Sequence, residues 1–284
     1  MASDGKPYLF SIDLEDVRLW MPDGLQYRER VPANTHRYLD WLRAHDAKTT
    51  FFTVGQLAEL YPSLIQEIAA EGHEIALHTH THRPLPELGP DGLAQDLARN
   101  INALLRAGAS RIEGFRAPIF SLTEATPWAH RVLAGAGLRY SSSVLPARNP
   151  LFGWPGFGAQ PREIDSLWEI PMSTARVGLG HLPFAGGTYM RLLPGAYVRR
   201  LFRQAQGPVL GYLHPYDIDT EQERFIHPGL GGSRLMNALM YVGRKTLLAK
   251  LDGLLAAGAR LQRYTDFVDT LAARPAARAA TAGR

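Results

Sequence analysis

Residues 74–82 read EIALHTHTH, a short apolar run followed at once by three histidines. A brief apolar run that contains a β-branched residue and ends in polar residues predicts a buried strand. In α/β proteins, the loops that follow such strands carry the functional groups. We therefore expect His78, His80 and His82 to lie in a loop at the carboxyl end of a strand.

The spacing of these histidines suits a metal ion. If the segment turns as a helix, residues four apart share one face, so His78 and His82 can converge on one cation. The chain contains no cysteine, so a metal must be held by histidine, aspartate or glutamate. The alternative is a solvated polar loop that holds three histidines without a ligand.

Outward from this stretch, short β-type runs alternate with longer helix-type runs, as in βα units around a parallel sheet or barrel. The sequence therefore predicts an α/β fold. The expected strands are residues 8–13, 48–54, 74–77, 112–116, 138–141, 167–170, 209–213 and 260–262. The expected helices are residues 35–45, 56–71, 90–107, 123–135, 194–204 and 233–257, and a last one from 265.

Length and composition favour one large domain. The chain has 284 residues, of which 45% are hydrophobic, so it can bury a substantial core. We expect a single domain over residues 1–271 and a disordered tail at 272–284. Residues 146–190 are rich in glycine, proline and aromatic residues, and we interpret them as a long irregular excursion over one barrel face with one clear strand.

Charge and hydropathy exclude several classes of partner. The net charge is only +4, and no basic patch interleaved with aromatic residues is present, so we expect no nucleic-acid partner. No run approaches the roughly 18 apolar residues of a transmembrane segment. The start, MASDGKPY, lacks the features of a signal peptide. We expect a cytoplasmic protein, whose oligomeric state the sequence leaves open.

Three acids, Asp13, Glu15 and Asp16, follow the first predicted strand. In an extended strand Asp13 and Glu15 point to the same face, whereas Asp16 points there only if the chain has already turned. Like charges that lie close together repel unless a cation compensates them. The alternative is a capped loop after an edge strand.

Two further polar residues follow predicted strands with the same polarity. Arg116, in FRAPIF, can hold the carboxylate of Asp13 ionised and oriented, although a surface salt bridge is the alternative. His214 follows the strand at 209–213, and a single histidine in such a place is more often structural. Because all four signals fall where α/β enzymes place their sites, we expect one shared site.

These motifs, in this order, resemble those of the polysaccharide deacetylases of carbohydrate esterase family 4. The resemblance covers roughly residues 7–267 and rests on DLED, KTTFFTVG, GHEIALHTHTH, FRAPIF and YLHP. It implies a distorted (β/α) barrel of about seven parallel strands. It also implies a hydrolase that uses a metal to remove the acetyl group from an N-acetylated sugar.

The resemblance assigns a role to each site residue. It implies that Asp13 is the catalytic base, that Arg116 orients it and that His214 is the catalytic acid. The metal ligands are then His78, His82 and Glu15, with Asp16 as the alternative to Glu15. Two imidazoles and one carboxylate suit Zn²⁺ best, and Co²⁺, Ni²⁺ or Fe²⁺ fit similar ligands. The expected substrate-binding residues are Tyr140, Ser141, His80 and Trp168, with a backbone N–H near Tyr140 or Ser141 on the oxyanion.

DLED, LPFAGGTYMRLLP and YLHPYDID together look like the branch associated with bacterial exopolysaccharide or surface-glycan assembly. That branch implies a sugar carried on a glycan, a lipid or a nucleotide. Two features depart from the commonest family pattern. The usual adjacent pair of aspartates is replaced by Asp-Leu-Glu-Asp, and Ile119 and Phe120 stand where a glycine is common.

Two other functions fit much of the same pattern. One is an amidohydrolase that cleaves a non-sugar C–N bond, as allantoinases do. Aromatic residues of the excursion can stack on a sugar or on a heterocycle, or simply form core, so they do not discriminate. The other is an inert glycan-binding relative, which we expect to lack the base or the acid, whereas Asp13 and His214 are both present.

Overall fold

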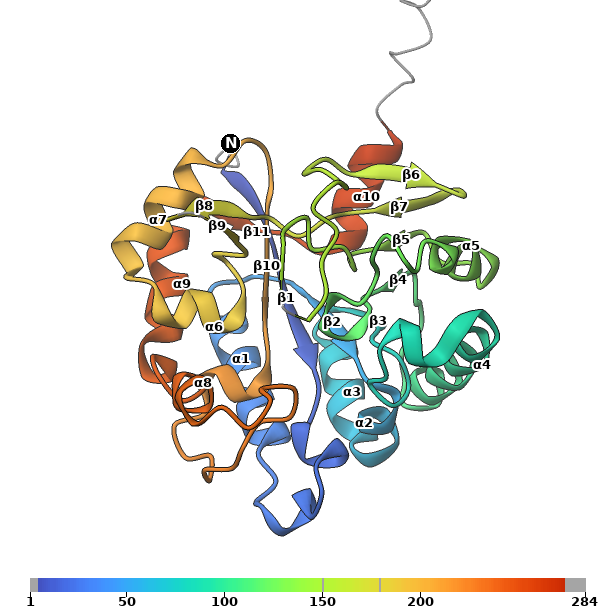
Figure 1. The fold of residues 1–284 in the computed structure, drawn as a ribbon, viewed down its shortest axis with the longest axis horizontal. Helices are drawn as coiled ribbons and strands as arrows, with labels where there is room; N and C mark the ends of the chain where they lie inside the picture. The colour runs from blue at the N-terminus through green and yellow to red at the C-terminus, as the bar shows by residue number, and fades with distance from the viewer. Residues whose placement is uncertain (1–4, 150, 179, 274–284) are drawn as a thin grey trace, which may run out of the picture.

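The computed structural model describes residues 5–149, 151–178 and 180–273. A nine-stranded sheet, in the order β10-β1-β2-β3-β4-β5-β7-β6 with β11 also paired to β1, forms its centre (Figure 1). All of its pairings are parallel except that of β6 with β7. The predicted α/β fold is therefore confirmed. Within the described residues, no strand pairing joins the two ends of this order, so the barrel is not closed by hydrogen bonds.

Most strands are short and fall where the sequence predicts them. The parallel strands are β1 (Lys6–Leu14), β2 (Thr50–Thr53), β3 (Glu74–Leu77), β4 (Gly114–Phe115), β5 (Tyr140–Ser141), β7 (Leu167–Glu169), β10 (Val209–Leu213) and β11 (Ala259–Leu261). The antiparallel strand is β6 (Arg162–Ile164), and β8 (Ala175–Val177) pairs only with β9 (Gly180–Leu182).

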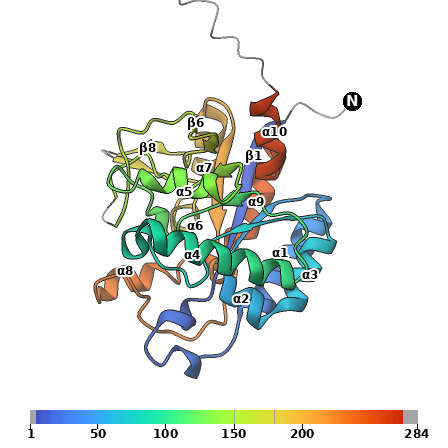
Figure 2. The ribbon, with the colours of Figure 1, turned by 90° about the vertical axis from the view of Figure 1, so that its right-hand side faces the viewer.

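Helices flank the sheet (Figures 1 and 2). They are α1 (Val31–Ala44), α2 (Gly55–Leu60), α3 (Pro62–Ala70), α4 (Leu85–Arg106), α5 (Trp128–Gly135), α6 (Gly187–Leu192), α7 (Gly195–Gln204), α8 (Arg234–Leu239), α9 (Leu247–Ala256) and α10 (Tyr264–Ala272). Short 3₁₀ turns are η1 (Val17–Trp20), η2 (Gly24–Gln26), η3 (Pro118–Phe120), η4 (Pro215–Ile218) and η5 (Arg244–Thr246). Among the described helices, none combines the length and the hydropathy that crossing a bilayer requires.

Three predicted elements need correction. The helix expected at residues 56–71 is two helices, because Pro62 starts a new one after Tyr61. The helix expected at 233–257 is interrupted before η5, where Gly243 adopts a positive φ of 77°. Residues 146–190 contain two hairpins rather than one clear strand.

The first of these hairpins has a two-residue turn with a weak sequence signature. Asp165 and Ser166 join β6 to β7, and both have positive φ, 51° and 65°. That conformation is typical of a tight hairpin turn whose usual sequence is Asn-Gly. The sequence Asp-Ser is a weaker signal, which explains why the hairpin was missed.

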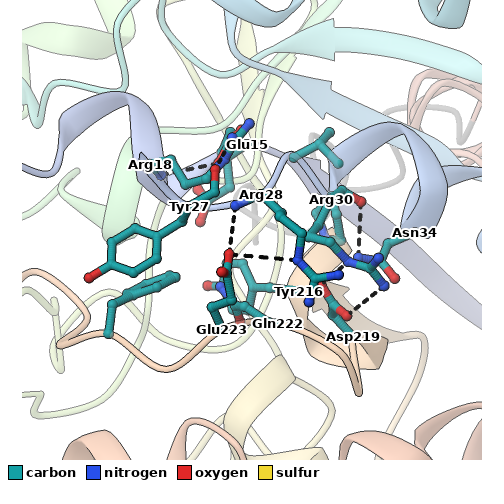
Figure 3. A pocket seen from close by; sticks show the side chains of 14 residues that line it. Glu15, Arg18, Tyr27, Arg28, Arg30, Asn34, Tyr216, Asp219, Gln222 and Glu223 are labelled. Atoms are coloured by element: carbon teal, nitrogen blue, oxygen red, sulfur yellow. Dashed lines mark hydrogen bonds and ion pairs between the residues drawn. The ribbon is translucent and has the colours of Figure 1, made fainter. Parts of the chain in front are cut away.

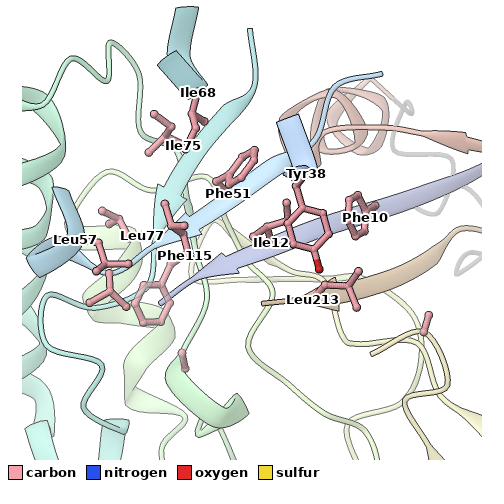
Figure 4. Close-up of a cluster of buried hydrophobic side chains, with 14 of the residues drawn as sticks. Phe10, Ile12, Tyr38, Phe51, Leu57, Ile68, Ile75, Leu77, Phe115 and Leu213 are labelled. Atoms are coloured by element: carbon pink, nitrogen blue, oxygen red, sulfur yellow. The ribbon is translucent and has the colours of Figure 1, made fainter. Parts of the chain in front are cut away.

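The central parallel strands β2 to β5 are buried on both faces, as in a sheet covered on both sides. On β1, Phe10 and Ile12 belong to the larger core cluster, which includes residues of the covering helices such as Tyr38 and Leu57 (Figure 4). Leu9 belongs instead to a second cluster on the opposite face. The sheet thus separates two apolar layers.

The sheet draws strands from residue 6 to residue 261 of the chain. The single domain over residues 1–271 stays a prediction, which this shared sheet supports. Most of the predicted disordered tail, from residue 274 onward, lies outside the described residues.

The second core layer leaves no room beside β4. A Cβ added to Gly114 would lie 1.9 Å from the ring of Tyr140, whereas a Cβ on the exposed helical Gly135 would meet nothing within 4 Å. Gly114→Ala should therefore lower the free energy of unfolding by about 1–3 kcal/mol through overpacking. Gly135→Ala should raise it by about 0.5–1 kcal/mol, because alanine loses less backbone entropy on folding.

Urea unfolding of both variants checks this pair of predictions. Equal stabilities of the two variants would contradict the packing that we describe between β4 and β5.

Candidate active site

The register of the sheet collects polar side chains at one edge. Along the second face of β1, Leu9 is followed at alternate positions by Ser11 and Asp13. Asp13 is paired with Phe52 on β2, and Phe52 with Ala76 on β3. His78 and His214 continue the same alternation beyond β3 and β10, since Ser11 is the partner of Tyr212. Parallel strands in register therefore aim these residues at one region.

Glu15, His78 and His82 form a compact group. One ligand atom from each lies within 4.8 Å of the others. The Nε2 atom of His82 is 2.7 Å from the Oε2 atom of Glu15, and that of His78 is 3.6 Å from the same oxygen. The ring of Trp20 stacks on His82 with centroids 4.3 Å apart, which fixes the orientation of this imidazole.

The donor set of this group fits a divalent metal. His78 places Nδ1 2.8 Å from the backbone oxygen of Arg116. A carbonyl only accepts hydrogen bonds, so Nδ1 carries the proton and the lone pair on Nε2 faces Glu15. Burial lowers the pKa of His82, which favours the neutral ring that a metal requires. Two neutral imidazoles and a carboxylate are a common set of zinc ligands.

Electrostatics favour the ionised form of Glu15. Burial by itself opposes ionisation of this carboxyl group. The neighbouring imidazoles of His82, His214 and His78 outweigh burial and hold the pKa of Glu15 well below its usual range.

His78 and His82 converge through a loop, not through the helical turn that their spacing suggested. Thr79 and His82 have φ of 58° and 56°, in the left-handed region, and no helix spans the segment. This loop turns His80 away from Glu15 and toward Glu59, and the predicted role of His80 in substrate binding stays a prediction. Its backbone N–H donates to Asp96, and a Cβ on Gly55 would lie 2.3 Å from its Nδ1 atom.

A neighbouring arginine distinguishes Asp16 from Glu15. Both carboxylate oxygens of Asp16 accept from the guanidinium of Arg18, at distances down to 2.6 Å. Asp16 also accepts from the backbone N–H of Arg18 and so caps η1. Asp16 is therefore committed to the turn, and the geometry favours Glu15 as the third ligand.

Asp13 and Arg116 form a buried ion pair with an N–O distance of 2.5 Å. Arg116 is fully buried, and its other N–H groups donate to Ser11, to the backbone and hydroxyl of Ser142 and to the hydroxyl of Tyr264. Burial would lower the pKa of Arg116, but the charge of Asp13 outweighs it and raises that pKa. The pair holds Asp13 in one orientation.

His214 has a carboxylate partner that the sequence prediction missed. Its Nδ1 atom lies 2.9 Å from Asp217, whose other oxygen accepts from Arg191 at 2.7 Å. On its other side, the Nε2 atom of His214 is 3.8 Å from Glu15. The ring of Tyr216 stacks on His214 with centroids 4.6 Å apart. The only sequence signal for Asp217 was its place three residues after His214 in YLHPYDID.

These neighbours favour a charged His214. Burial lowers its pKa, but Glu15 and Asp217 outweigh burial and raise the pKa to about 9. Burial raises the pKa of Asp217, yet Arg191 and His214 together lower it to about 2. A ring that favours the charged form thus lies beside Glu15.

Three predicted substrate-binding residues lie elsewhere. Tyr140 is fully buried, its hydroxyl donates to Glu74 at the start of β3, and its backbone N–H donates to the backbone of Glu113. Ser141 is buried and donates to Ser143. Trp168 is half-buried against the second core cluster. The hydroxyl groups of Tyr140 and Ser141 are thus engaged within the protein, and the contact of these three residues with a sugar stays a prediction.

The position where the family commonly has glycine is conformationally unusual. Ile119 and Phe120 both adopt the left-handed region, with φ of 49° and 55°. Side chains with a Cβ rarely adopt this region, and it is least favourable for a β-branched residue. Phe120 packs edge-on against Tyr212, with ring centroids 4.8 Å apart. This strained turn therefore contacts β10, the strand that leads to His214.

A narrow cavity lies beside Glu15, between the segments around residues 15–34 and 215–225 (Figure 3). Ion pairs of Arg30 with Asp219 and Glu221, and a hydrogen bond from the backbone of Arg28 to Glu223, join the two segments across it. Its volume of about 20 Å³ holds little more than one water molecule. In this conformation it is too small for a sugar ring.

Two protein families match adjacent parts of the chain. Polysaccharide deacetylase matches residues 21–140, and a domain of unknown function (DUF3473) matches residues 142–268. The first region contains His78, His82 and Arg116, and the second contains His214. Residues 21–140 are thus similar to the polysaccharide deacetylase family, as the motifs predicted.

Curated relatives match a limited stretch. A peptidoglycan-N-acetylglucosamine deacetylase from Bacillus cereus is 32% identical over 90 residues, which cover 32% of this chain and 33% of that protein. A chitooligosaccharide deacetylase from Sinorhizobium fredii is 36% identical over 88 residues, covering 31% and 41%. The chain thus spans less than half the length of these relatives.

Solved structures support the fold over nearly the whole chain. A provisionally assigned polysaccharide deacetylase from Mycobacterium smegmatis has a TM-score of 0.62 at 21% identity, covering 96% of this chain and 93% of that one. A family 4 pseudoenzyme from Bacillus anthracis has a TM-score of 0.52 at 13% identity, covering 94% and 66%. Because the fold also occurs in a pseudoenzyme, the residues of the site must decide the activity.

Measuring Zn²⁺ binding in substituted chains distinguishes the role of Glu15 from the roles of Asp16 and His80. Glu15→Gln removes the anionic ligand, so we expect it to weaken Zn²⁺ binding at least about tenfold, a loss typical of metal-site substitutions. Asp16→Asn and His80→Gln should bind Zn²⁺ within a few-fold of the unaltered chain, since neither side chain faces the cluster. Calorimetric titration of the metal-free proteins measures this, with circular dichroism as the control for folding. Loss of binding in Asp16→Asn but not in Glu15→Gln would reverse the ligand assignment.

Proposed function

We propose that this chain is a metal-dependent hydrolase that removes the acetyl group from an N-acetylated sugar. The observation that carries the proposal is the convergence of three units at one edge of the sheet. These units are the Glu15–His78–His82 cluster, the Asp13–Arg116 pair and the His214–Asp217 pair. The names of the curated relatives, deacetylases of peptidoglycan N-acetylglucosamine and of chitooligosaccharides, support the same substrate class.

Glu15, His78 and His82 would hold the metal, with Zn²⁺ the ion that best suits this donor set. When bound, such an ion would act as a Lewis acid that polarises the acetyl carbonyl and lowers the pKa of water. The chain's own contribution is to fix the ligands. His78 is oriented by the backbone of Arg116, and His82 by the ring of Trp20.

Asp13 is the general base in this proposal. It accepts the proton of the attacking water, which converts the water into a nucleophile for the acetyl carbon. Arg116 positions Asp13 through the buried ion pair. A base that is already oriented avoids the cost of reorganisation when the reaction begins.

His214 is the general acid. After water has added to the amide carbon, the C–N bond breaks and the sugar nitrogen must gain a proton. The Nδ1 atom of His214 is bound to Asp217, so its Nε2 atom, on the side of Glu15, carries the proton for transfer. Asp217 thus sets both the orientation and the charge of the acid, as a positioning residue.

The proposal extends to the biosynthetic role, the cellular location and the competing substrate class. We infer a role in bacterial surface-polysaccharide biosynthesis, supported by the resemblance of DLED, LPFAGGTYMRLLP and YLHPYDID to that branch. A cytoplasmic location stays a prediction. The competing substrate class is a heterocyclic C–N compound such as allantoin.

Acetate release tests the activity and its base. The metal-loaded chain should release acetate from N-acetylglucosamine oligomers and not hydrolyse allantoin, and verified removal of the metal should abolish acetate release. Asp13→Asn should lower kcat by about 10²–10⁴, since it removes general-base catalysis. Zn²⁺ binding should persist in this variant, because Asp13 is not a ligand.

Three results would contradict this account. They are full acetate release after verified metal removal, unchanged kcat in Asp13→Asn, and turnover of allantoin but of no N-acetyl sugar. Sugar binding without turnover in the metal-loaded chain would favour the inert glycan-binding alternative.

A further inference from the structure

Within the segment between η4 and α9, the part that follows the exposed Glu221 and Glu223 has an unusual charge distribution. We call residues 224–245 the rim segment. It contains Arg224, Arg234, Arg244 and Lys245 and not one aspartate or glutamate. Arg244 is buried and the other three basic residues are exposed. An exposed basic stretch without acids is complementary to an anionic surface.

The rim segment also exposes large apolar side chains. The exposed fractions are 49% for Ile226, 73% for Leu235, 48% for Met236 and 48% for Val242. Helix α8, which carries Leu235 and Met236, has no buried residue. Single exposed apolar residues are ordinary, but a helix without a fully buried residue that presents leucine and methionine to solvent suggests a surface that is covered in use.

The rim segment is attached to the acid end of the candidate site. Arg191, which holds Asp217, also donates to the backbone oxygens of Met240 and Val242 at 2.9 and 2.8 Å. Asp217 in turn holds His214. Both ribbon views place α8 at the end of the molecule opposite α10, the end toward which β1 runs (Figures 1 and 2). The rim segment is therefore linked to His214 through the hydrogen bonds of Arg191 and Asp217.

We propose that the rim segment docks on an anionic lipid bilayer. Leu235 and Met236 insert among the acyl chains near the headgroups, and Arg224, Arg234 and Lys245 face the lipid phosphates. Apolar residues beside basic ones are what an interfacial membrane-binding segment requires, because insertion and charge attraction add. The purpose of docking rests on the proposed function: the sugar substrate is presented at a membrane surface, next to His214.

Vesicle binding tests the proposal without using activity. The 284-residue chain should co-sediment with vesicles of equimolar phosphatidylcholine and phosphatidylglycerol, and not with phosphatidylcholine alone. Raising the salt concentration should weaken binding, since part of the attraction is electrostatic. Arg234→Glu should weaken binding at least about fivefold, the contribution of one basic residue near an anionic surface. The double variant Leu235→Ser/Met236→Ser should weaken it by at least as much.

Matched controls lie on other helices. Leu105→Ser on α4 removes a leucine that is 48% exposed, and Arg131→Glu on α5 reverses an exposed charge. Both should bind vesicles as the unaltered chain does. Acetate release from a soluble N-acetyl sugar should be unchanged in Leu235→Ser/Met236→Ser, which shows that the site is intact.

Three results would overturn the proposal. The first is no co-sedimentation with anionic vesicles at low salt, and the second is equal losses of binding in the rim and control variants. The third is a dimer in light scattering that Leu235→Ser/Met236→Ser converts to monomer while vesicles capture neither form, because the rim segment then pairs with a second copy. Vesicle binding by a chain that deacetylates no sugar would refute the proposed function and leave this proposal standing.

Discussion

The candidate site depends on one buried carboxylate. Glu15 lies within 3.8 Å of imidazole nitrogens from His78, His82 and His214, which come from two distant parts of the chain. A buried carboxylate without compensation would cost several kcal/mol, so its surroundings must supply positive charge or a metal. The surroundings of Glu15 are suited to both. The imidazoles of His78 and His82 offer lone pairs to a metal, and the imidazole of His214 favours its charged form. The remaining features of the site orient these rings.

The sheet brings Glu15 and the three histidines together, because β1 lies between the strands that lead to them. It pairs with β2, which leads through β3 to His78, and with β10, which leads to His214. Its own end supplies Asp13 and Glu15. The two family regions, residues 21–140 and 142–268, therefore contribute to one edge, and neither contains Asp13 or Glu15. The site is complete only when both regions pack around β1.

The local sequence pattern was enough to predict the strands and the residues that alternation along a strand directs to the same face. β3 and β10 have the predicted bounds, and alternation along strands, with the family resemblance, predicted the meeting of Glu15 with His78 and of Asp13 with Arg116. Details set by non-local packing were not predictable. His80 is turned away by left-handed residues in its loop, which no spacing rule reveals.

Long-range partners were missed for the same reason. Arg191 and Asp217 are 26 residues apart, and their pairing depends on how α6 packs against η4. Tyr140 was assigned to the substrate although its hydroxyl lies at Glu74, at the start of β3 and away from the polar edge. Position at a strand end predicts proximity to a site, whereas the direction of a side chain depends on the packed neighbours.

The shared metal is the central claim, and zinc K-edge X-ray absorption of the zinc-loaded chain tests it most directly. The account predicts a first shell of nitrogen and oxygen near about 2.0–2.2 Å with the outer-shell scattering of two imidazoles. The double variant His78→Gln/His82→Gln should lose that imidazole scattering. Zinc bound without imidazole in the unaltered chain, or with the same imidazole scattering in the double variant, would contradict the account.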